Sequence, residues 1–153
     1  MKKTRFITFS AIIAAVYAAM TLVVAPLSYG PIQIRLSESL TILAAFTPAA
    51  VPGLFFGCLI ANLYTGNIID IIFGSLTTLA AAVLTYKLRK RHWLAPLPPV
   101  VLNAVVVGYY LTLQYGGLLP MNILTVGAGQ FVACYILPIY FIINFDKIKR
   151  SGA

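Results

Sequence analysis

Charged residues are scarce in this chain. They make up 9% of its 153 residues, whereas 61% of the residues are hydrophobic. A soluble globular domain carries roughly a quarter charged residues, so this composition excludes an ordinary soluble domain. A membrane-crossing helix needs about 20 mainly apolar residues, which leaves room for about five or six crossings and for no soluble catalytic domain. The composition therefore predicts one membrane-embedded domain over residues 1–153.

The chain also lacks the residue patterns on which most enzymes depend. It has no glycine-rich phosphate loop, no nucleotide-binding motif, and no set of serine, histidine and acid, so we expect neither catalysis nor use of ATP by this chain alone. His92 stands in a basic cluster, and Cys58 and Cys134 stand in separate apolar runs. We therefore expect no metal site, no disulfide and no cofactor, and we interpret both cysteines as buried small hydrophobic residues.

The net charge of +8 comes from three separate basic clusters. They lie at residues 2–5, 87–91 and 147–150, and Arg35 is the only basic residue outside them. Such clusters between apolar runs follow the positive-inside rule, so we expect contact with membrane lipid and no binding to nucleic acid. Six crossings place all three clusters on one side, whereas five would separate one of them. The charges thus predict a multi-pass protein of the cell membrane with both termini cytoplasmic.

Apolar runs, broken by glycine and proline, predict the limits of six transmembrane helices in an all-α protein. We expect these helices at about residues 6–25, 37–46, 53–64, 68–86, 96–115 and 121–145. The second and third runs are short and form a pair that turns at residues 47–52. Pro138 is expected to kink the last helix.

The segment Tyr29–Leu40 separates the first two predicted helices and contains Arg35 and Glu38. Gly30 and Pro31 end the preceding helix, and the next residues have no helical periodicity. We predict an extracellular lid that closes over a small polar ligand. The alternative is a plain connector in which Arg35 and Glu38 pair with each other and with water.

Small residues recur along the first predicted helix. Ala11, Ala15 and Ala19 form one ridge at four-residue spacing, and Ala14 and Ala18 form another. Small side chains let a second helix approach closely inside a membrane. Either ridge can therefore pack against the protein's own helices or serve as the docking surface for a separate protein.

Polar residues within apolar helices are the candidate binding residues, because burying a polar group in a bilayer costs free energy. Asn103, Tyr110 and Gln114 share one predicted helix face, and Asp70 begins another helix near the outer side. The candidate substrate-binding residues are Arg35, Glu38, Asn62, Asp70, Asn103, Tyr110, Gln114 and Gln130. Carboxylates, amides and a phenol suit a small, flat, polar heterocycle. The alternative for each residue is a hydrogen bond between helices.

Three stretches of the chain resemble the QueT family. They are the run from Gly30 to Glu38, the run from Pro52 to Cys58 with Ala61 and Asn62, and Asp70 with Phe73 to Leu76, Thr78 and Leu79. The resemblance covers nearly the whole chain and is most specific over residues 30–80. The family consists of substrate-binding S components of energy-coupling-factor (ECF) transporters, assigned to queuosine precursors.

The resemblance implies a six-helix S component with a lid loop between the first two helices. It also implies a transmembrane coupling protein and two cytoplasmic ATPase subunits as partners. The family's docking face is an Ala-x-x-x-Ala pattern, which matches Ala11 with Ala15 or Ala14 with Ala18. The implied ligand is a 7-deazaguanine, either 7-aminomethyl-7-deazaguanine or 7-cyano-7-deazaguanine, with Glu38 or Asp70 accepting its donors.

Three other functions fit the sequence. The chain could be an S component for another vitamin or purine-like micronutrient, or a transporter that acts alone. It could also be a structural membrane protein whose polar residues only join its helices. Substitution of Glu38 or Gln114 tests the structural role, which would change stability and leave ligand affinity untouched.

Overall fold

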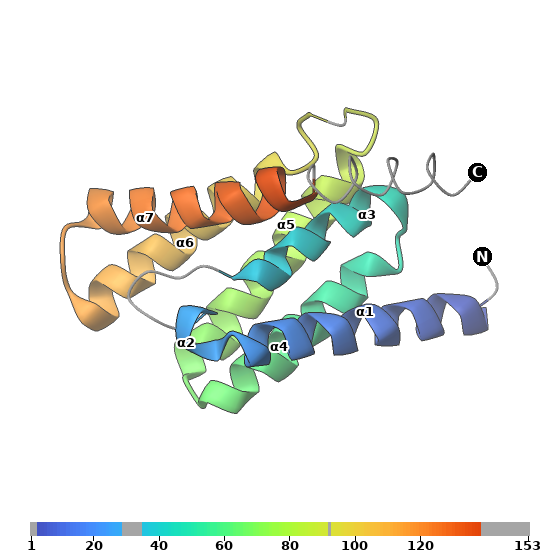
Figure 1. Ribbon diagram of the computed structural model, residues 1–153, viewed down its shortest axis with the longest axis horizontal. Coiled ribbons are helices and arrows are strands. Elements are labelled where there is room, and N and C mark those ends of the chain that lie inside the picture. The colour runs from blue at the N-terminus through green and yellow to red at the C-terminus, as the bar shows by residue number, and fades with distance from the viewer. Residues whose placement is uncertain (1–2, 29–34, 92, 139–153) are drawn as a thin grey trace, which may run out of the picture.

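The computed structural model describes residues 3–28, 35–91 and 93–138, and these residues are almost wholly helical (Figure 1). The helical segments in chain order are α1 (Lys3–Val23), α2 (Ala25–Ser28), η1 (Leu36–Ile42), α3 (Leu43–Phe46), α4 (Ala50–Thr65), η2 (Asp70–Gly74), α5 (Ser75–Lys87), α6 (Leu97–Tyr115), α7 (Leu119–Phe131) and η3 (Val132–Ile136). Because η1 continues into α3, η2 into α5, and α7 into η3, the segments form six main helices. The predicted all-α class is confirmed, and the described ranges contain no strand.

Consecutive helices run in alternating directions (Figure 1). The helix α1 packs along α4, α6 packs along α7, and α5 lies between α4 and α6. The α4–α5 and α6–α7 turns lie at the end opposite the start of α1 (Figure 1). The alternation agrees with an even number of helices, and the orientation of the termini in a membrane stays a prediction.

Three described helices are long and apolar enough to cross a membrane, judged by length and composition. They are Lys3–Val23, Leu97–Tyr115 and Leu119–Ile136, whereas Leu36–Phe46 and Ala50–Thr65 are apolar but shorter. The first part of Leu36–Phe46 is a 3₁₀ helix, which rises about 2.0 Å per residue compared with about 1.5 Å in an α-helix. The short helix therefore reaches further than its residue count suggests. The number of membrane crossings stays a prediction.

Two prolines that were expected to lie before helices lie instead within their first turns. The third helix was expected to begin at Gly53, but α4 begins at Ala50 and contains Pro52 in its first turn. Proline is tolerated there because the first backbone N–H groups of a helix have no partner within the helix. Likewise α7 begins at Leu119, earlier than expected, with Pro120 in its first turn. The predicted continuation from residue 139 to 145 lies outside the described residues.

Two glycines of α4 let α1 approach it closely. A Cβ atom added to Gly53 would lie 2.8 Å from the Ser10 carbonyl oxygen. A Cβ added to Gly57 would lie 2.8 Å from both the Ala14 carbonyl oxygen and the Tyr17 Cβ. Two helices at such a distance need a residue without a side chain at the contact. The α1–α4 pair is therefore fixed in register by these glycines.

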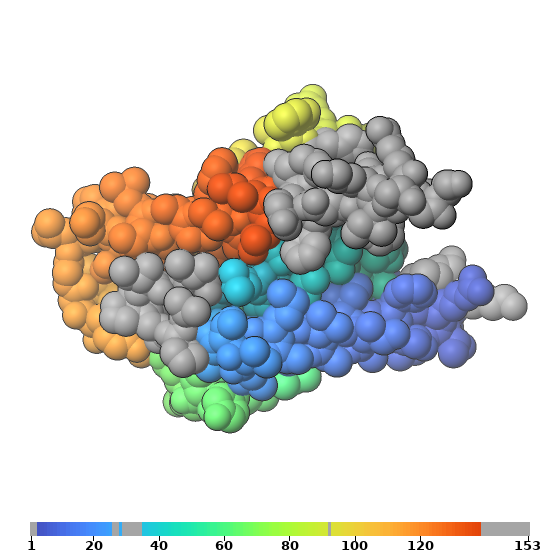
Figure 2. Space-filling model, in the orientation of Figure 1, coloured from blue at the N-terminus to red at the C-terminus, as the bar shows by residue number. Residues whose placement is uncertain are grey.

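The 3₁₀ helix η1 lies against both α1 and η3. Viewed from the face drawn in Figure 2, η1 and α3 reach the surface between α1 and α7. Inside this arrangement, Tyr17, Ser37 and Glu38 have no exposed surface. The centre of the molecule is thus polar as well as apolar, and it is organised around η1.

Candidate functional site

Two buried carboxylates define the polar centre, and each accepts a hydrogen bond from a tyrosine on another helix. The Tyr17 hydroxyl on α1 donates to Glu38 Oε1 at 2.5 Å. The Tyr110 hydroxyl on α6 donates to Asp70 Oδ1, also at 2.5 Å. All four residues are at least 95% buried, with Asp70 the most exposed at 5%. A buried carboxylate needs such donors, because removing its charge from water is costly.

Glu38 is held mainly by hydroxyl groups. Besides Tyr17, Thr78 of α5 places its hydroxyl 3.1 Å from Glu38 Oε1. On the backbone side, Thr41 donates to the Glu38 carbonyl at 2.6 Å, and the Cys134 thiol lies 3.5 Å from the same oxygen. Next to Glu38, the Thr21 hydroxyl of α1 donates to Ser37 Oγ at 2.6 Å. The short helix η1 is therefore tied to α1, α5 and η3 around Glu38.

Asp70 has a different environment, because Arg35 and two polar side chains occupy its oxygens. Arg35 Nη2 lies 3.7 Å from Asp70 Oδ1 in an ion pair whose side chains are 3% and 7% exposed. Asn67 Nδ2 donates to Asp70 Oδ2 at 3.0 Å. Asp70 stands in a π-helical turn, η2, a geometry that often marks functional sites. Both oxygens of Asp70 are thus occupied by groups of the protein itself.

Asn62 and Asn103 add amides to the same centre. Asn62 Nδ2 donates to the Asp70 carbonyl at 2.8 Å, and the Asn103 side chain lies beside the Glu38 carboxylate. Within the described residues, three buried atoms of these side chains have no hydrogen-bond partner: Glu38 Oε2, Asn62 Oδ1 and Asn103 Nδ2. A buried polar group without a partner costs about 1–3 kcal/mol. Glu38 and Asn103 lie side by side without a hydrogen bond of normal geometry between Oε2 and Nδ2, so a bound molecule that pairs with these atoms and with Asn62 Oδ1 would stabilise the centre.

Most of the sequence-predicted residues come together here. Arg35, Glu38, Asn62, Asp70, Asn103 and Tyr110 belong to this polar centre. Gln130 is 2% exposed and lies at its edge, where the Cys134 thiol lies 3.7 Å from Gln130 Oε1. Gln114 differs, because it is exposed in the last turn of α6. The predicted stripe on α6 is therefore buried at Asn103 and Tyr110 but not at Gln114.

The predicted lid is described only in part, because residues 29–34 lie outside the described ranges. Arg35 directly precedes η1, and Glu38 lies in its first turn. The alternative was a plain connector in which Arg35 and Glu38 pair with each other and with water, and the contact with water is wrong, since both residues are buried. Arg35 also forms an ion pair with Asp70. The C-terminal part of the predicted lid is thus built into the polar centre.

Sequence reasoning missed Tyr17, Thr78 and the role of Cys58. The prediction that both cysteines are buried is confirmed, but the Cys58 sulfur lies 3.3 Å from Asn62 Nδ2, 3.4 Å from the Thr78 hydroxyl and 3.8 Å from Arg35 Nη1. The available signal was the four-residue spacing of Cys58 and Asn62, which places them on one helix face. Tyr17 was hidden among the alanines of the first helix.

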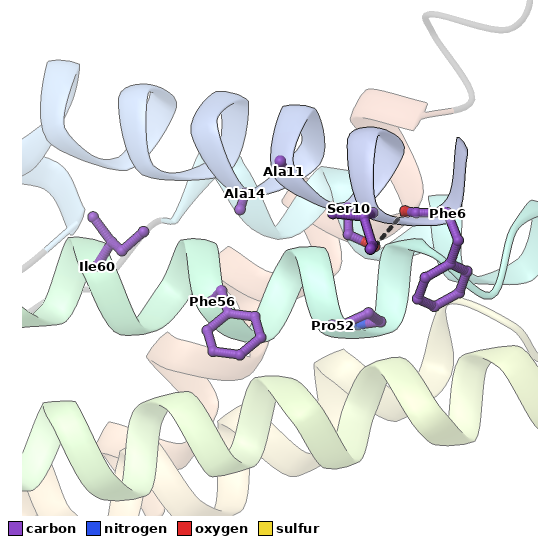
Figure 3. A pocket seen from close by; sticks show the side chains of 8 residues that line it. Phe6, Ser10, Ala11, Ala14, Pro52, Phe56 and Ile60 are labelled. Atoms are coloured by element: carbon purple, nitrogen blue, oxygen red, sulfur yellow. Dashed lines mark hydrogen bonds between the residues drawn. The ribbon is translucent and has the colours of Figure 1, made fainter. Parts of the chain in front are cut away.

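The two alanine ridges of α1 have different surroundings. Ala14 and Ala18 are 7% exposed and face the interior, where Ala14 touches Gly57 closely. Ala11, Ala15 and Ala19 are exposed. Ala11 and Ala14 also line an apolar groove of about 460 Å³ between α1 and α4, opposite Phe56 and Ile60 (Figure 3). The exposed ridge is thus the one of the two that is open to another molecule.

Comparisons with known proteins identify the family. A family model described as "QueT transporter" matches residues 7–147. This chain belongs to the QueT transporter family. A curated relative, the "Queuosine precursor transporter QueT" of Lactococcus lactis subsp. cremoris (strain MG1363), is 39% identical over 79 residues, which are 50% of this chain and 47% of the relative. The match thus spans about half the length of that QueT protein, and no solved structure matches this chain.

A substitution at Gly74 tests whether the polar centre of this QueT-family chain binds ligand. A Cβ added there would lie 3.0 Å from Asn62 Nδ2 and 3.6 Å from Arg35 Nη1, so an alanine presses on the ends of two side chains and not on backbone. We expect Gly74→Ala to weaken ligand binding about 3- to 10-fold and to change thermal stability little. Calorimetric titration and a melting curve measure both quantities. A large loss of stability with unchanged affinity would contradict a binding role.

Proposed function

We propose that this chain is the substrate-binding S component of an ECF-type importer and captures a queuosine precursor from outside the cell. The main support for this proposal is the buried polar centre, in which Arg35, Glu38 and Asp70 are all enclosed among largely apolar helices. Charges in such a position are costly, and they usually mark the path or the site of a polar ligand. The name of the Lactococcus relative supports a queuosine precursor as that ligand.

The chemistry of the centre supports a 7-deazaguanine, in its 7-aminomethyl or 7-cyano form. Such a ring presents adjacent N–H donors and a carbonyl acceptor along one edge. Asn62 Oδ1 offers a matching acceptor, and Asn103 Nδ2 offers a donor. Buried amides without partners discriminate strongly, because a ligand that fails to pair them leaves them unsatisfied. These groups favour a purine-like ligand over an apolar one.

The route of entry in this proposal runs past η1. Arg35 and Glu38 lie at the beginning of η1, which reaches the surface between α1 and α7 (Figure 2). In this proposal, a shift of η1 away from α1 and η3 opens the polar centre. Residues 29–40 act as the lid in this proposal, with Glu38 contacting the ligand and Arg35 holding the lid closed.

Transport in this proposal requires a transmembrane coupling protein and two cytoplasmic ATPase subunits. The exposed ridge of Ala11, Ala15 and Ala19 supports docking of the coupling protein, since small residues permit close helix contact in lipid. The internal ridge of Ala14 and Ala18 is already used against α4. Docking is therefore assigned to Ala11 and Ala15 rather than to Ala14 and Ala18.

Ligand binding by the purified chain tests the proposal directly. In lipid nanodiscs, we expect 7-aminomethyl-7-deazaguanine or 7-cyano-7-deazaguanine to raise the melting temperature and to bind at micromolar concentration or below. Riboflavin, thiamine and biotin serve as controls with a different edge chemistry. Binding of one of these vitamins and of neither deazaguanine would overturn the proposed substrate.

Docking is tested by enlarging one residue of the exposed ridge. We expect Ala15→Leu to reduce co-purification of the coupling protein about tenfold or more and to leave ligand affinity unchanged, because the side chain projects away from the polar centre. Ala128→Leu on the exposed face of α7 is the matched control and should leave co-purification intact. Equal loss in both variants would contradict docking through the ridge.

A further inference from the structure

The two carboxylates of the polar centre are not equivalent in their hydrogen bonding. Both oxygens of Asp70 are occupied: Oδ1 accepts from Tyr110 and faces Arg35, and Oδ2 accepts from Asn67. Glu38 accepts hydrogen bonds from the Tyr17 and Thr78 hydroxyl groups on Oε1. Its Oε2 atom receives no hydrogen bond of normal length and angle from the described residues, and the side chain of Asn103, a neutral amide, lies beside the carboxylate. Glu38, not Asp70, therefore has an oxygen that a stronger donor from another molecule can pair with.

The polar centre also contains more acidic than basic side chains. The chain has three acidic residues, and two of them, Glu38 and Asp70, are buried in the polar centre. Arg35 is the only basic residue outside the three terminal and loop clusters, and its ion pair is with Asp70. Two buried carboxylates thus share one guanidinium. A ligand that brings a positive charge would balance the second carboxylate.

The single available oxygen of Glu38 restricts what it can bind. A guanine-like edge has two adjacent N–H donors and pairs best with both oxygens of one carboxylate. Oε1 of Glu38 already accepts hydrogen bonds from two hydroxyl groups, so this paired arrangement would break the hydrogen bonds from Tyr17 and Thr78. An ammonium group needs only one oxygen and forms a charge-assisted hydrogen bond with it. The geometry thus favours an amine at Glu38 and the ring edge at the asparagine amides.

From these observations, and resting on the proposed function, we infer that Glu38 is the specificity-determining residue and receives a protonated amine of the ligand. Asp70 is a positioning residue that holds Arg35 against η2. The site therefore takes a cationic heterocycle: 7-aminomethyl-7-deazaguanine, which carries an ammonium group, in preference to 7-cyano-7-deazaguanine, which is neutral. The two molecules share the same ring edge, so they differ only in the group assigned to Glu38.

The experiment compares both compounds on the full chain in nanodiscs by calorimetric titration. We expect the wild type to bind the aminomethyl compound about 10- to 100-fold more tightly than the cyano compound. Glu38→Gln, which keeps the shape of the side chain, should remove this preference by weakening only the aminomethyl compound. Asp70→Asn is the matched control and should weaken both compounds by a similar factor, leaving the preference in place. Melting curves establish that each variant is folded.

The outcomes separate the inference from the proposed function. If the wild type binds both compounds equally, or if Glu38→Gln weakens both alike, Glu38 does not read the amine and the inference is overturned. Loss of the preference in Asp70→Asn alone would also overturn it, by assigning the amine to the other acid. If the folded wild type binds neither compound, the proposed function itself fails. An aminomethyl preference in the wild type that disappears only in Glu38→Gln supports both.

Discussion

Replacement of Arg35 by leucine is expected to cost about 3–5 kcal/mol of unfolding free energy. The substitution removes the guanidinium that pairs with Asp70 at 3.7 Å, and the aspartate is only 7% exposed in its side chain. An uncompensated carboxylate then remains in a buried polar centre that also contains Glu38. Titration with sodium dodecyl sulfate, followed by circular dichroism, measures the loss in the purified chain.

A second substitution shows whether charge is the cause. Asp70→Asn in the Arg35→Leu background removes the unpaired charge and keeps an oxygen that can accept from the Tyr110 hydroxyl. We expect the double variant to regain at least about 1 kcal/mol relative to Arg35→Leu, because paired residues are not additive. Additive losses would mean that Arg35 stabilises the protein through packing alone.

The overall fold followed from composition and from the spacing of the breaks. Long apolar runs predict helices because backbone polar groups in lipid must be satisfied internally. Prediction failed at helix starts, where Pro52 and Pro120 were interpreted as breaks although both lie in first turns. A proline lacks a backbone N–H whether it stands before a helix or in its first turn. Only the packing of the helix that follows determines where the helix begins.

The sequence predicted which residues form the polar centre, but it did not predict their hydrogen-bond and ion-pair partners. The free-energy cost of placing a charge in a membrane singles out Glu38 and Asp70, since few charged residues occur in the apolar runs. Their partners depend on irregular helical turns: Glu38 lies in a 3₁₀ helix and Asp70 in a π-helical turn. Sequence periodicity assumes 3.6 residues per turn, so it does not predict which residues share a face in a 3₁₀ or π-helical segment. The stripe through Asn103 failed at Gln114 for a different reason: α6 is a regular α-helix, but Gln114 is exposed in its last turn, and helical periodicity does not show where burial ends along a helix.

The partner of Glu38 on α1 illustrates a further limit. Tyr17 stands between Ala14 and Ala18, and its position suggested only part of a packing surface. Its hydroxyl reaches Glu38 because Gly57 allows α1 to approach α4 closely, as the 2.8 Å distance from a hypothetical Gly57 Cβ to the Tyr17 Cβ indicates. The site therefore depends on a helix contact that no local sequence signal describes.

That contact gives the second large expected effect. Gly57→Ala places a methyl group 2.8 Å from the Ala14 carbonyl oxygen and 3.1 Å from the Ala14 Cα, and neither backbone atom can turn aside. The α1 helix must shift, which stretches the 2.5 Å hydrogen bond from Tyr17 to Glu38. We expect a loss of about 1–3 kcal/mol in unfolding free energy and a loss of ligand affinity of about tenfold or more.

Gly127→Ala is the matched control for this substitution. It adds the same methyl group between α7 and α6, but the single neighbour within 4 Å is the Ala104 Cβ at 3.3 Å, which a small shift relieves. We expect a change in unfolding free energy below about 1 kcal/mol and unaltered ligand affinity. Tyr17→Phe provides the complementary variant, since it removes the hydroxyl without moving α1. If Gly57→Ala weakens ligand binding through the displaced hydroxyl, Tyr17→Phe should reproduce the loss of affinity with a smaller loss of stability. Full affinity in Tyr17→Phe would instead assign the effect of Gly57→Ala to a general disturbance of α1 and α4.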